Sequence, residues 1–180
     1  MRKTCLLLIL LLSGFCLLAQ YKLEFVKPDI SAGKFRITLK MSSTIPFSLG
    51  PNNLRFNYPT ENLDNPIIIS DNFPAEIFGE TTLVGSNRQT GVVSVNTAYH
   101  GQTAAGNLNI NKDGKELVII EFGIVKPAEG ITLSWRLDKH PKTAVVSDDK
   151  MIITAGEAKP LTLNIPVSYT HLTLPTKRIV

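Results

Sequence analysis

Cysteine is nearly absent from this chain of 180 residues, because the two present, Cys5 and Cys16, both lie within residues 1–20. The remainder therefore has no disulfide, no thiol nucleophile and no cysteine ligand for a metal ion. A domain built from it must be stabilised by apolar burial alone. About 145 residues can bury roughly two thirds of the surface that the unfolded chain exposes. We expect one domain, residues 21–166, with a single core.

Groups suited to catalysis are scarce as well. Of the three histidines, His171 lies near the C-terminus, and His100 and His140 lie in polar, turn-like sequence that is typical of solvated loops. There is no Gly-x-Ser-x-Gly pattern, and no pair of acidic residues stands apart from the solvent-facing strand positions. Nucleophilic hydrolysis needs a base beside the nucleophile, and glycoside hydrolysis needs two facing carboxyl groups. The sequence therefore predicts no catalytic site and no cofactor in this segment.

The N-terminal segment has the pattern of an export signal. A short basic start precedes an unbroken apolar run, residues 5–12, and Ala19 supplies a small residue for cleavage. The run is shorter than the about 20 apolar residues that a transmembrane helix needs. We predict that residues 1–20 are a signal peptide, with no membrane insertion after cleavage and a secreted or cell-surface destination. Cys16 raises lipoprotein processing as an alternative, which the bulky Phe15 disfavours.

The C-terminal segment is unlike the rest of the chain. Residues 167–176 resemble one reading frame of the end sequence used in transposon-based sequencing libraries. The resemblance implies that residues 167–180 are an artefact tail derived from an adapter. It also implies that the natural open reading frame was cut near Ile165, with further sequence missing downstream. A genuine strand rich in threonine and leucine is the alternative.

Charge of either sign is not in excess in the predicted domain. The formal net charge of +4 arises from Arg2, Lys3, Lys177 and Arg178 in the two terminal segments. Without these residues the count of Lys+Arg falls from 19 to 15, which equals the 15 Asp+Glu. A neutral domain without a basic stripe lacks the electrostatic footprint for nucleic acid or an anionic membrane. We therefore expect no nucleic-acid partner.

What the sequence does contain is alternation of apolar and polar residues with a period of two. Residues 34–41 and 131–137 show it most clearly, and residues 116–125 are more continuously apolar, as in a central strand covered on both faces. No window combines a helical period with caps. The pattern predicts an all-β fold, an antiparallel β-sandwich of jelly-roll type. Further strands are predicted at residues 21–26, 53–58, 67–70, 91–96, 108–111, 151–154 and 161–165.

One segment imitates a metal-binding motif. Residues 109–114 have oxygen side chains at alternate positions and a glycine at the sixth, as in the first half of a calcium loop. The twelfth position, where an EF-hand needs a bidentate carboxylate, is Ile120. The Asp-Gly pair at the end of this segment is instead a strong hairpin signal. We therefore expect a turn that joins two antiparallel strands, residues 108–111 and 115–122, and no metal site.

Two other features have both a functional and a structural interpretation. Trp135, the only tryptophan, could stack a sugar, but it shares the apolar face of its strand with Leu133 and Leu137, which favours packing in the core. Asp148 and Asp149 could donate oxygens to calcium, but they are also typical of a solvated acidic turn. We expect neither feature to form a ligand site.

Several segments together resemble cohesin-like modules. In that family a strand typically ends in Tyr-Asp-Pro-x-x-Leu; Tyr58 and Leu63 fit, whereas Pro59 follows the tyrosine directly and the aspartate is absent. The chain also resembles the N-terminal module of large exported Bacteroidota proteins that end in a type IX secretion sorting domain. The segments that resemble cohesin-like modules are residues 35–41, 53–63, 91–95 and 113–122.

The resemblance implies a jelly-roll sandwich that binds an extracellular protein or glycan as one part of a multidomain protein. The expected function is that of a noncatalytic extracellular binding or adhesion module. The alternative is a glycan-binding module attached to a hydrolase encoded beyond the cut. No contact residue of the family matches a position here, so no binding residue is assigned.

Overall fold

The computed structural model describes residues 20–84, 89–101 and 107–166, so the predicted signal peptide up to residue 19 and the segment from residue 167 lie outside the described residues. The described residues form strands joined by turns and contain no helix, and thus none with the length and hydropathy of a membrane span. The strands are β1 (Gln20–Ser31), β2 (Lys34–Ser43), β3 (Phe47–Asn57), β4 (Leu63–Asp71), β5 (Phe78–Leu83), β6 (Val92–Tyr99), β7 (Asn109–Ile110), β8 (Lys115–Ile124), β9 (Ala128–Trp135), β10 (Ala144–Ser147), β11 (Thr154–Ala158) and β12 (Leu161–Ile165).

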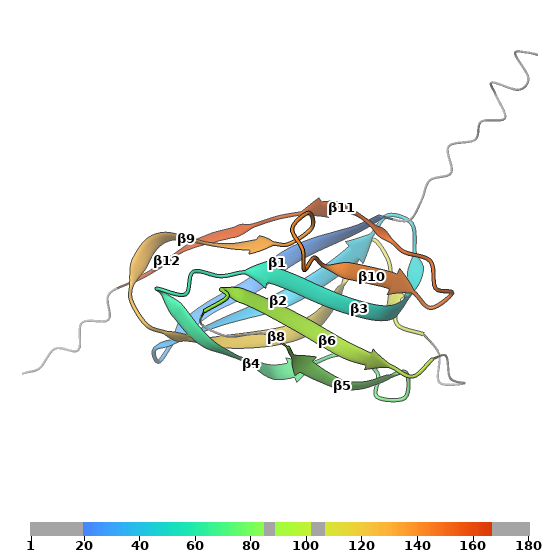
Figure 1. Cartoon of the computed structure of the whole chain (residues 1–180), viewed down its shortest axis with the longest axis horizontal. Coiled ribbons are helices and arrows are strands. Elements are labelled where there is room, and N and C mark those ends of the chain that lie inside the picture. Colours follow the sequence, from blue (N-terminus) through green and yellow to red (C-terminus); the bar gives the residue numbers. More distant parts are fainter. Residues whose placement is uncertain (1–19, 85–88, 102–106, 167–180) are drawn as a thin grey trace, which may run out of the picture.

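These strands form two sheets that face each other (Figure 1). The five-stranded sheet has the order β11-β1-β2-β8-β4. The seven-stranded sheet has the order β12-β9-β3-β6-β5, and β7 and β10 also pair with β3. The strand pairs are antiparallel except for β1 and β11, which are parallel. The predicted all-β, antiparallel jelly-roll sandwich is confirmed.

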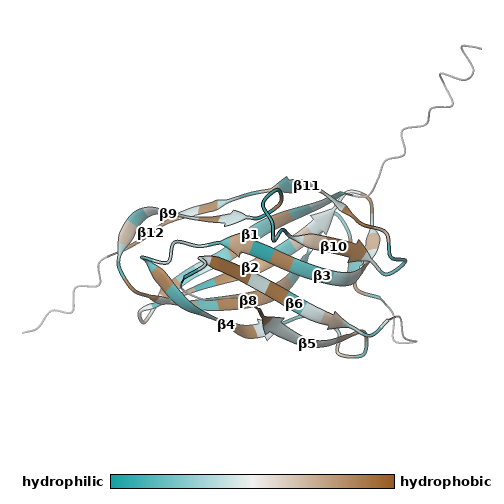
Figure 2. Cartoon of the chain, in the orientation of Figure 1, coloured by the Kyte–Doolittle hydropathy of each residue, from teal (hydrophilic) through white to brown (hydrophobic). Residues whose placement is uncertain are grey.

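The core lies between the two sheets, where each strand turns its apolar positions inward. Along β2 the alternate residues Phe35, Ile37, Leu39 and Met41 have no exposed surface. Each such side chain stabilises the fold by about 1.5 to 3 kcal/mol through burial. Figure 2 shows the resulting alternation of apolar and polar segments along the strands. Aromatic rings join the two sheets: Phe56 of β3 lies edge-on to Phe122 of β8, with ring centroids 6.4 Å apart.

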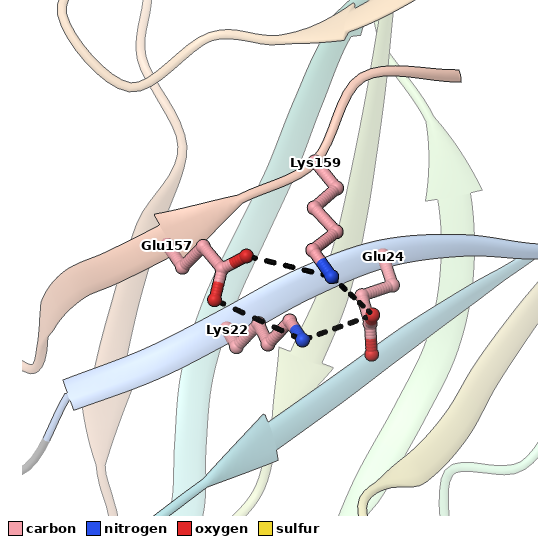
Figure 3. A network of polar contacts seen from close by, with 4 residues as sticks. All are labelled: Lys22, Glu24, Glu157 and Lys159. Carbon is pink, nitrogen blue, oxygen red and sulfur yellow. Dashed lines mark ion pairs between the residues drawn. The ribbon is translucent and has the colours of Figure 1, made fainter. Parts of the chain in front are cut away.

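The parallel pair β1–β11 forms one edge of the five-stranded sheet, and two lysines and two glutamates contact one another beside it. Lys22 contacts Glu24 at 3.1 Å and Glu157 at 3.8 Å, and Lys159 contacts Glu157 at 3.7 Å and Glu24 at 4.0 Å (Figure 3). The pKa of Lys22 is raised, chiefly by its hydrogen bond to Glu24. Exposed pairs of this kind contribute little each, so the ladder hydrogen bonds carry most of the β1–β11 association.

The predicted hairpin at residues 111–114 is wrong in its pairing, although the turn itself is present. Gly114 has a φ of +75° and donates its N–H to the Asn111 carbonyl at 3.1 Å, and Asn111 Oδ1 accepts the Asp113 N–H at 3.1 Å. The strands on either side belong to different sheets, because β7 pairs with β3 whereas β8 pairs with β2 and β4. The turn is therefore a crossover between the sheets.

Other predicted strands also differ in detail. Of residues 151–154, only Thr154 belongs to a strand, as the first residue of β11; Ile152 forms an isolated bridge with Val146 and is 83% exposed. β8 is a central strand as expected, between β2 and β4. Val118 and Ile120 are buried in the core, and at the alternate positions Leu117 and Glu121 are buried and Ile119 is half-buried. Strands β5 and β10 were not predicted, since their short sequences show little alternation.

Candidate binding face

The outer face of β3, β6 and β9 carries amide, hydroxyl and guanidinium groups. Because Leu54 and Phe56 of β3 point into the core, the residues next to them in the sequence point outward. Strand pairing places these outward residues beside outward residues of β6 and β9. We call this surface the polar face, and it consists of Asn53, Arg55, Asn57, Ser94, Asn96 and Ser134.

Hydrogen bonds between side chains fix the polar face. Arg55 Nε donates to Ser94 Oγ at 2.9 Å, and Ser94 Oγ donates to Asn53 Oδ1 at 3.1 Å. Asn57 Nδ2 donates to Ser134 Oγ at 3.3 Å across the β3–β9 pair. These groups are thus ordered before any ligand arrives, which lowers the entropic cost of binding.

A loop interrupts the sheet at the border of the polar face. Strands β9 and β10 follow one another along β3: Trp135 pairs with Phe56, and Ala144 pairs with Asn53 (Figure 1). Residues 136–143, the 136–143 loop, leave the sheet between them. The loop reaches the outer side of the sheet, because its residues contact the outward side chains of the polar face.

Thr143 fills the place in the ladder that the loop leaves open. Its hydroxyl accepts the Arg55 backbone N–H at 2.9 Å and donates to the Arg55 carbonyl at 3.0 Å. The side chain is buried, with 5% of its surface exposed. The hydroxyl thus supplies the acceptor for the Arg55 N–H, whereas the Arg55 carbonyl also accepts the Arg136 backbone N–H at 2.9 Å.

Arg136 holds the 136–143 loop against the polar face. Its Nε donates to the Pro141 carbonyl at 2.9 Å, its Nη2 to the His140 carbonyl at 2.9 Å and its Nη1 to Asn57 Oδ1 at 2.8 Å. Arg55 Nη1 adds a hydrogen bond to the Lys142 carbonyl at 3.3 Å. Both guanidinium groups contact neutral oxygens, so their positive charge is not cancelled by these contacts.

The opposite outer face, on the five-stranded sheet, is different because its charges pair with each other. Glu121 accepts from Arg36 Nε at 2.7 Å and lies 3.6 Å from Lys34, and Lys27 contacts Glu116 at 2.7 Å. The hydrogen bond from Arg36 lowers the pKa of Glu121, and the charges of Arg36 and Lys34 act in the same direction. Lys27, Lys34 and Arg36 on this face are therefore paired with acids, and Ile67 and Ile69 of β4 are exposed on the same sheet. The polar face instead presents neutral donors and acceptors beside cations that form no ion pair with a described residue.

Trp135 lies at the margin of the core and is less deeply buried than its position on the apolar face of the strand predicted. Its ring stacks on Phe25, with centroids 4.5 Å apart and planes at 15°, and lies edge-on to Phe56 at 5.7 Å. The side chain is half-buried, and its buried Nε1–H has no acceptor among the described residues. Part of the residue borders a hollow of about 190 Å³, lined by Asn57, Ser134, Trp135, Arg136, Leu137, Asp138 and Lys139.

The residues that sequence patterns singled out for catalysis or metal binding do not form a site. His100 follows β6 and His140 lies in the 136–143 loop, and both are exposed. Asp149 accepts from the Ser147 hydroxyl, which lowers its pKa, and from the Met151 N–H. Across residues 20–84, 89–101 and 107–166 no group of three or more His, Cys, Asp or Glu side chains could hold a metal ion.

Three larger hollows lined by described residues lie away from the polar face's centre. One of about 460 Å³ lies at the β3–β4 connection, and Glu61 is the only carboxylate in its lining. Another, of about 430 Å³, is lined by Tyr21, Lys22 and Glu157 among others, and burial raises the pKa of Tyr21 to about 12. Tyr21 thus keeps its proton at neutral pH. Neither of these two hollows brings together the two carboxyl groups that glycoside hydrolysis requires. The third, of about 330 Å³, has Glu61 and Glu129 in its lining.

Sequence analysis did not identify the residues that organise the polar face. Arg136 occupies an ordinary polar position of a predicted strand, and Thr143 lies in a segment with no strand pattern. Their roles depend on contacts with β3, about eighty positions away along the chain. The only usable signal was the outward pattern of Asn53, Arg55 and Asn57.

The two sheets, their strand order and the parallel pairing of β1 with the edge strand β11 define a cohesin-like jelly-roll sandwich. The second type II cohesin module of the ScaA scaffoldin of Acetivibrio cellulolyticus superposes with a TM-score of 0.59 at 13% identity, over 89% of this chain and 96% of that chain. The cohesin module of a family 33 glycoside hydrolase of Clostridium perfringens gives 0.55 at 13% identity, over 82% and 96%. A type I cohesin–dockerin complex of Clostridium thermocellum gives 0.53 at 10% identity, over 82% and 99%.

These similarities concern the fold, since the identities are low. No protein-family model matches the chain, and no curated protein matches it in sequence. The predicted cohesin-like β-sandwich is confirmed at the level of the fold.

Proposed function

We propose that residues 21–166 form a noncatalytic module that binds a protein partner through the polar face. The solved structures with this fold include cohesins in complex with dockerin proteins, which supports a protein as partner. The observation that favours the polar face is the contrast between the two outer surfaces. On one, Lys27, Lys34 and Arg36 form ion pairs with acids of the protein, and the other has ordered polar groups beside cations that form no ion pair with a described residue.

The chemistry of the polar face suits a protein interface. Its fixed amide and hydroxyl groups can donate to and accept from a partner's backbone and side chains, and an interface typically has one hydrogen bond per 100 to 200 Å². Because these groups are already held by mutual hydrogen bonds, a partner loses little affinity in ordering them. We further propose that the module acts outside the cell, as the export-signal pattern of residues 1–20 suggests.

Photocrosslinking from each outer face tests the proposal. A photoreactive amino acid is placed at Asn96 on the polar face or, as the matched control, at Lys34 on the five-stranded sheet. The protein is then exposed to extracellular proteins of its source organism. We expect a discrete protein adduct from position 96 and none from position 34. Adducts of equal yield from both positions, or only from position 34, would contradict the proposed face.

A glycan ligand is the alternative, and the position of Trp135 beside a hollow is the observation that favours it. Against it, one face of the indole is already stacked on Phe25. A glycan array separates the two functions. Saccharide binding that Trp135→Ala abolishes would favour the glycan, whereas the proposed protein-binding function predicts no such signal.

A further inference from the structure

The 136–143 loop concentrates positive charge at one border of the polar face. Arg136, Lys139 and Lys142 belong to it, Arg55 touches it through the Lys142 carbonyl, and Asp138 is its single acid. None of these four cations forms an ion pair with any described residue. The cations of the opposite sheet at Lys27, Lys34 and Arg36 do, as shown above. This border is therefore a surface of uncompensated charge within a domain that is neutral in sum.

The cations differ in how firmly they are held. Arg136 uses three of its N–H groups on neutral oxygens. A guanidinium has five N–H donors, so two remain without an acceptor among the described residues. Lys139 and Lys142 are exposed and can adjust to a ligand. A fixed guanidinium flanked by adaptable ammonium groups suits a carboxylate, because a planar fork sets the geometry and point charges add attraction.

A hollow of about 190 Å³ lies beside these groups, and Arg136 and Lys139 both line it. Its remaining lining offers the amide of Asn57 and the hydroxyl of Ser134, which hydrogen-bond to each other, and it also includes Trp135, Leu137 and Asp138. The two cations of the lining therefore exceed its one acid. The space is local, so it suits a single projecting side chain better than an extended surface.

We infer that the 136–143 loop determines the specificity of the polar face by taking an acidic segment of the protein partner, with a carboxylate side chain in the hollow lined by Arg136 and Lys139. The inference rests on the proposed function and adds the partner's chemistry to it. Charges at the rim of an interface act mainly on the association rate and on its dependence on salt. Lys139 and Lys142 therefore steer the acidic segment, and Arg136 orients it.

Peptide titration followed by NMR tests this inference. The isotope-labelled protein is titrated at low ionic strength with a short blocked peptide of alternating Glu and Ser, and separately with the Gln–Ser counterpart. We expect the acidic peptide to shift the amide signals of the 136–143 loop and Arg55, and the neutral peptide to shift none. The double variant Lys139→Gln/Lys142→Gln should weaken binding about tenfold, and added salt should weaken it in the unchanged protein.

The control variant is Lys115→Gln/Lys126→Gln, which removes the same charge from exposed positions away from the polar face. It should bind the acidic peptide as the unchanged protein does. Equal weakening in the two double variants, shifts confined to residues other than the loop and Arg55, or equal binding of the Gln peptide would overturn the inference. Preferential binding of polygalacturonate through the same lysines would overturn the protein as partner class.

The two proposals can fail separately. A photocrosslinked partner from position 96 whose capture is unaffected by Lys139→Gln/Lys142→Gln would leave the proposed function standing and end this inference. Unchanged melting temperatures of both double variants establish that the comparison concerns binding and not folding.

Discussion

Thr143 shows how one side chain can complete a sheet where two strands leave a gap. Its hydroxyl pairs with both backbone groups of Arg55, in a buried position. A valine there would keep the shape and remove both hydrogen bonds. We expect Thr143→Val to lower the free energy of unfolding by about 1 to 3 kcal/mol, since the Arg55 N–H would lose its acceptor while the Arg55 carbonyl keeps the Arg136 N–H. Urea unfolding measures this, and Thr143→Ser, which keeps the hydroxyl, should cost less. Equal losses for the two variants would show that the methyl group matters and the hydrogen bonds do not.

Trp135 tests whether the margin of the core contributes to stability. Its stacking on Phe25 and edge contact with Phe56 should make Trp135→Ala cost about 3 kcal/mol, near the lower end for a large aromatic residue because the side chain is only half-buried. Trp135→Phe should retain most of the stability. Thermal melting of both variants, with fluorescence quenching of the unchanged protein, gives the answer. A freely quenched tryptophan together with an unchanged melt would contradict the packing described here.

At the level of elements, the crossover turn between β7 and β8 satisfies its own polar groups. Asn111 Oδ1, which a calcium loop would direct to the metal, accepts the N–H of Asp113. We therefore expect millimolar calcium to leave the melting temperature unchanged, since a ligand of the folded state would raise it. Differential scanning fluorimetry with calcium and with a chelator measures the shift. A rise that Asp113→Ala abolishes would indicate a metal site at this turn.

The ion pairs between β2 and β8 predict a pH dependence of stability. The pKa of Glu121 lies below its ordinary value of 4.5 because of the hydrogen bond from Arg36. A lowered folded-state pKa contributes stability that is present above the unfolded-state value and is lost as the pH falls through the folded-state value. The stability advantage over Glu121→Gln should thus be full at neutral pH and shrink below about pH 4.5. Urea unfolding across this range measures it, and Glu80→Gln, an exposed control without an ion pair among the described residues, should show no such change with pH.

Local patterns predicted the strands better than their partners. The alternation in β2 is visible in residues 35–41 because every second side chain enters one core, and this information is contained within the strand. The pairing of β7 with β3 instead of β8 depends on where Ile110 finds its buried position. The interruption between β9 and β10 likewise depends on contacts with another strand, β3. Such contacts join segments far apart in the sequence, and a turn signal alone does not determine which strands pair. The sequence predicted the position of the Asp-Gly turn correctly, but not which strands its flanking segments pair with.

At the scale of the whole molecule, the outer surfaces of the two sheets differ in how their polar and charged groups are paired. One outer surface is occupied by internal ion pairs, and the other keeps its hydrogen-bonding groups ordered and its cations unpaired. This asymmetry was not evident from composition, because the neutral sum of charges conceals how they are distributed. Binding measurements on variants of each face, as described above, are therefore more informative than the net charge.

The parallel pairing of β1 and β11 has a mechanical consequence. β1 begins at one end of the sandwich and β12 ends at the other (Figure 1). Tension applied between Gln20 and Ile165 therefore pulls β1 and β11 in opposite directions along their axes, and the ladder bonds are loaded together in shear. Tension between Gln20 and Ser43, at the shared end of β1 and β2, would instead open that ladder one bond at a time. Single-molecule pulling should give a clearly higher unfolding force for the first attachment, since the force reports the unfolding barrier. Equal unfolding forces for the two attachments would mean that strands other than β1 and β11 separate first. A higher force for the Gln20–Ile165 attachment would make this module suited to holding a partner under load.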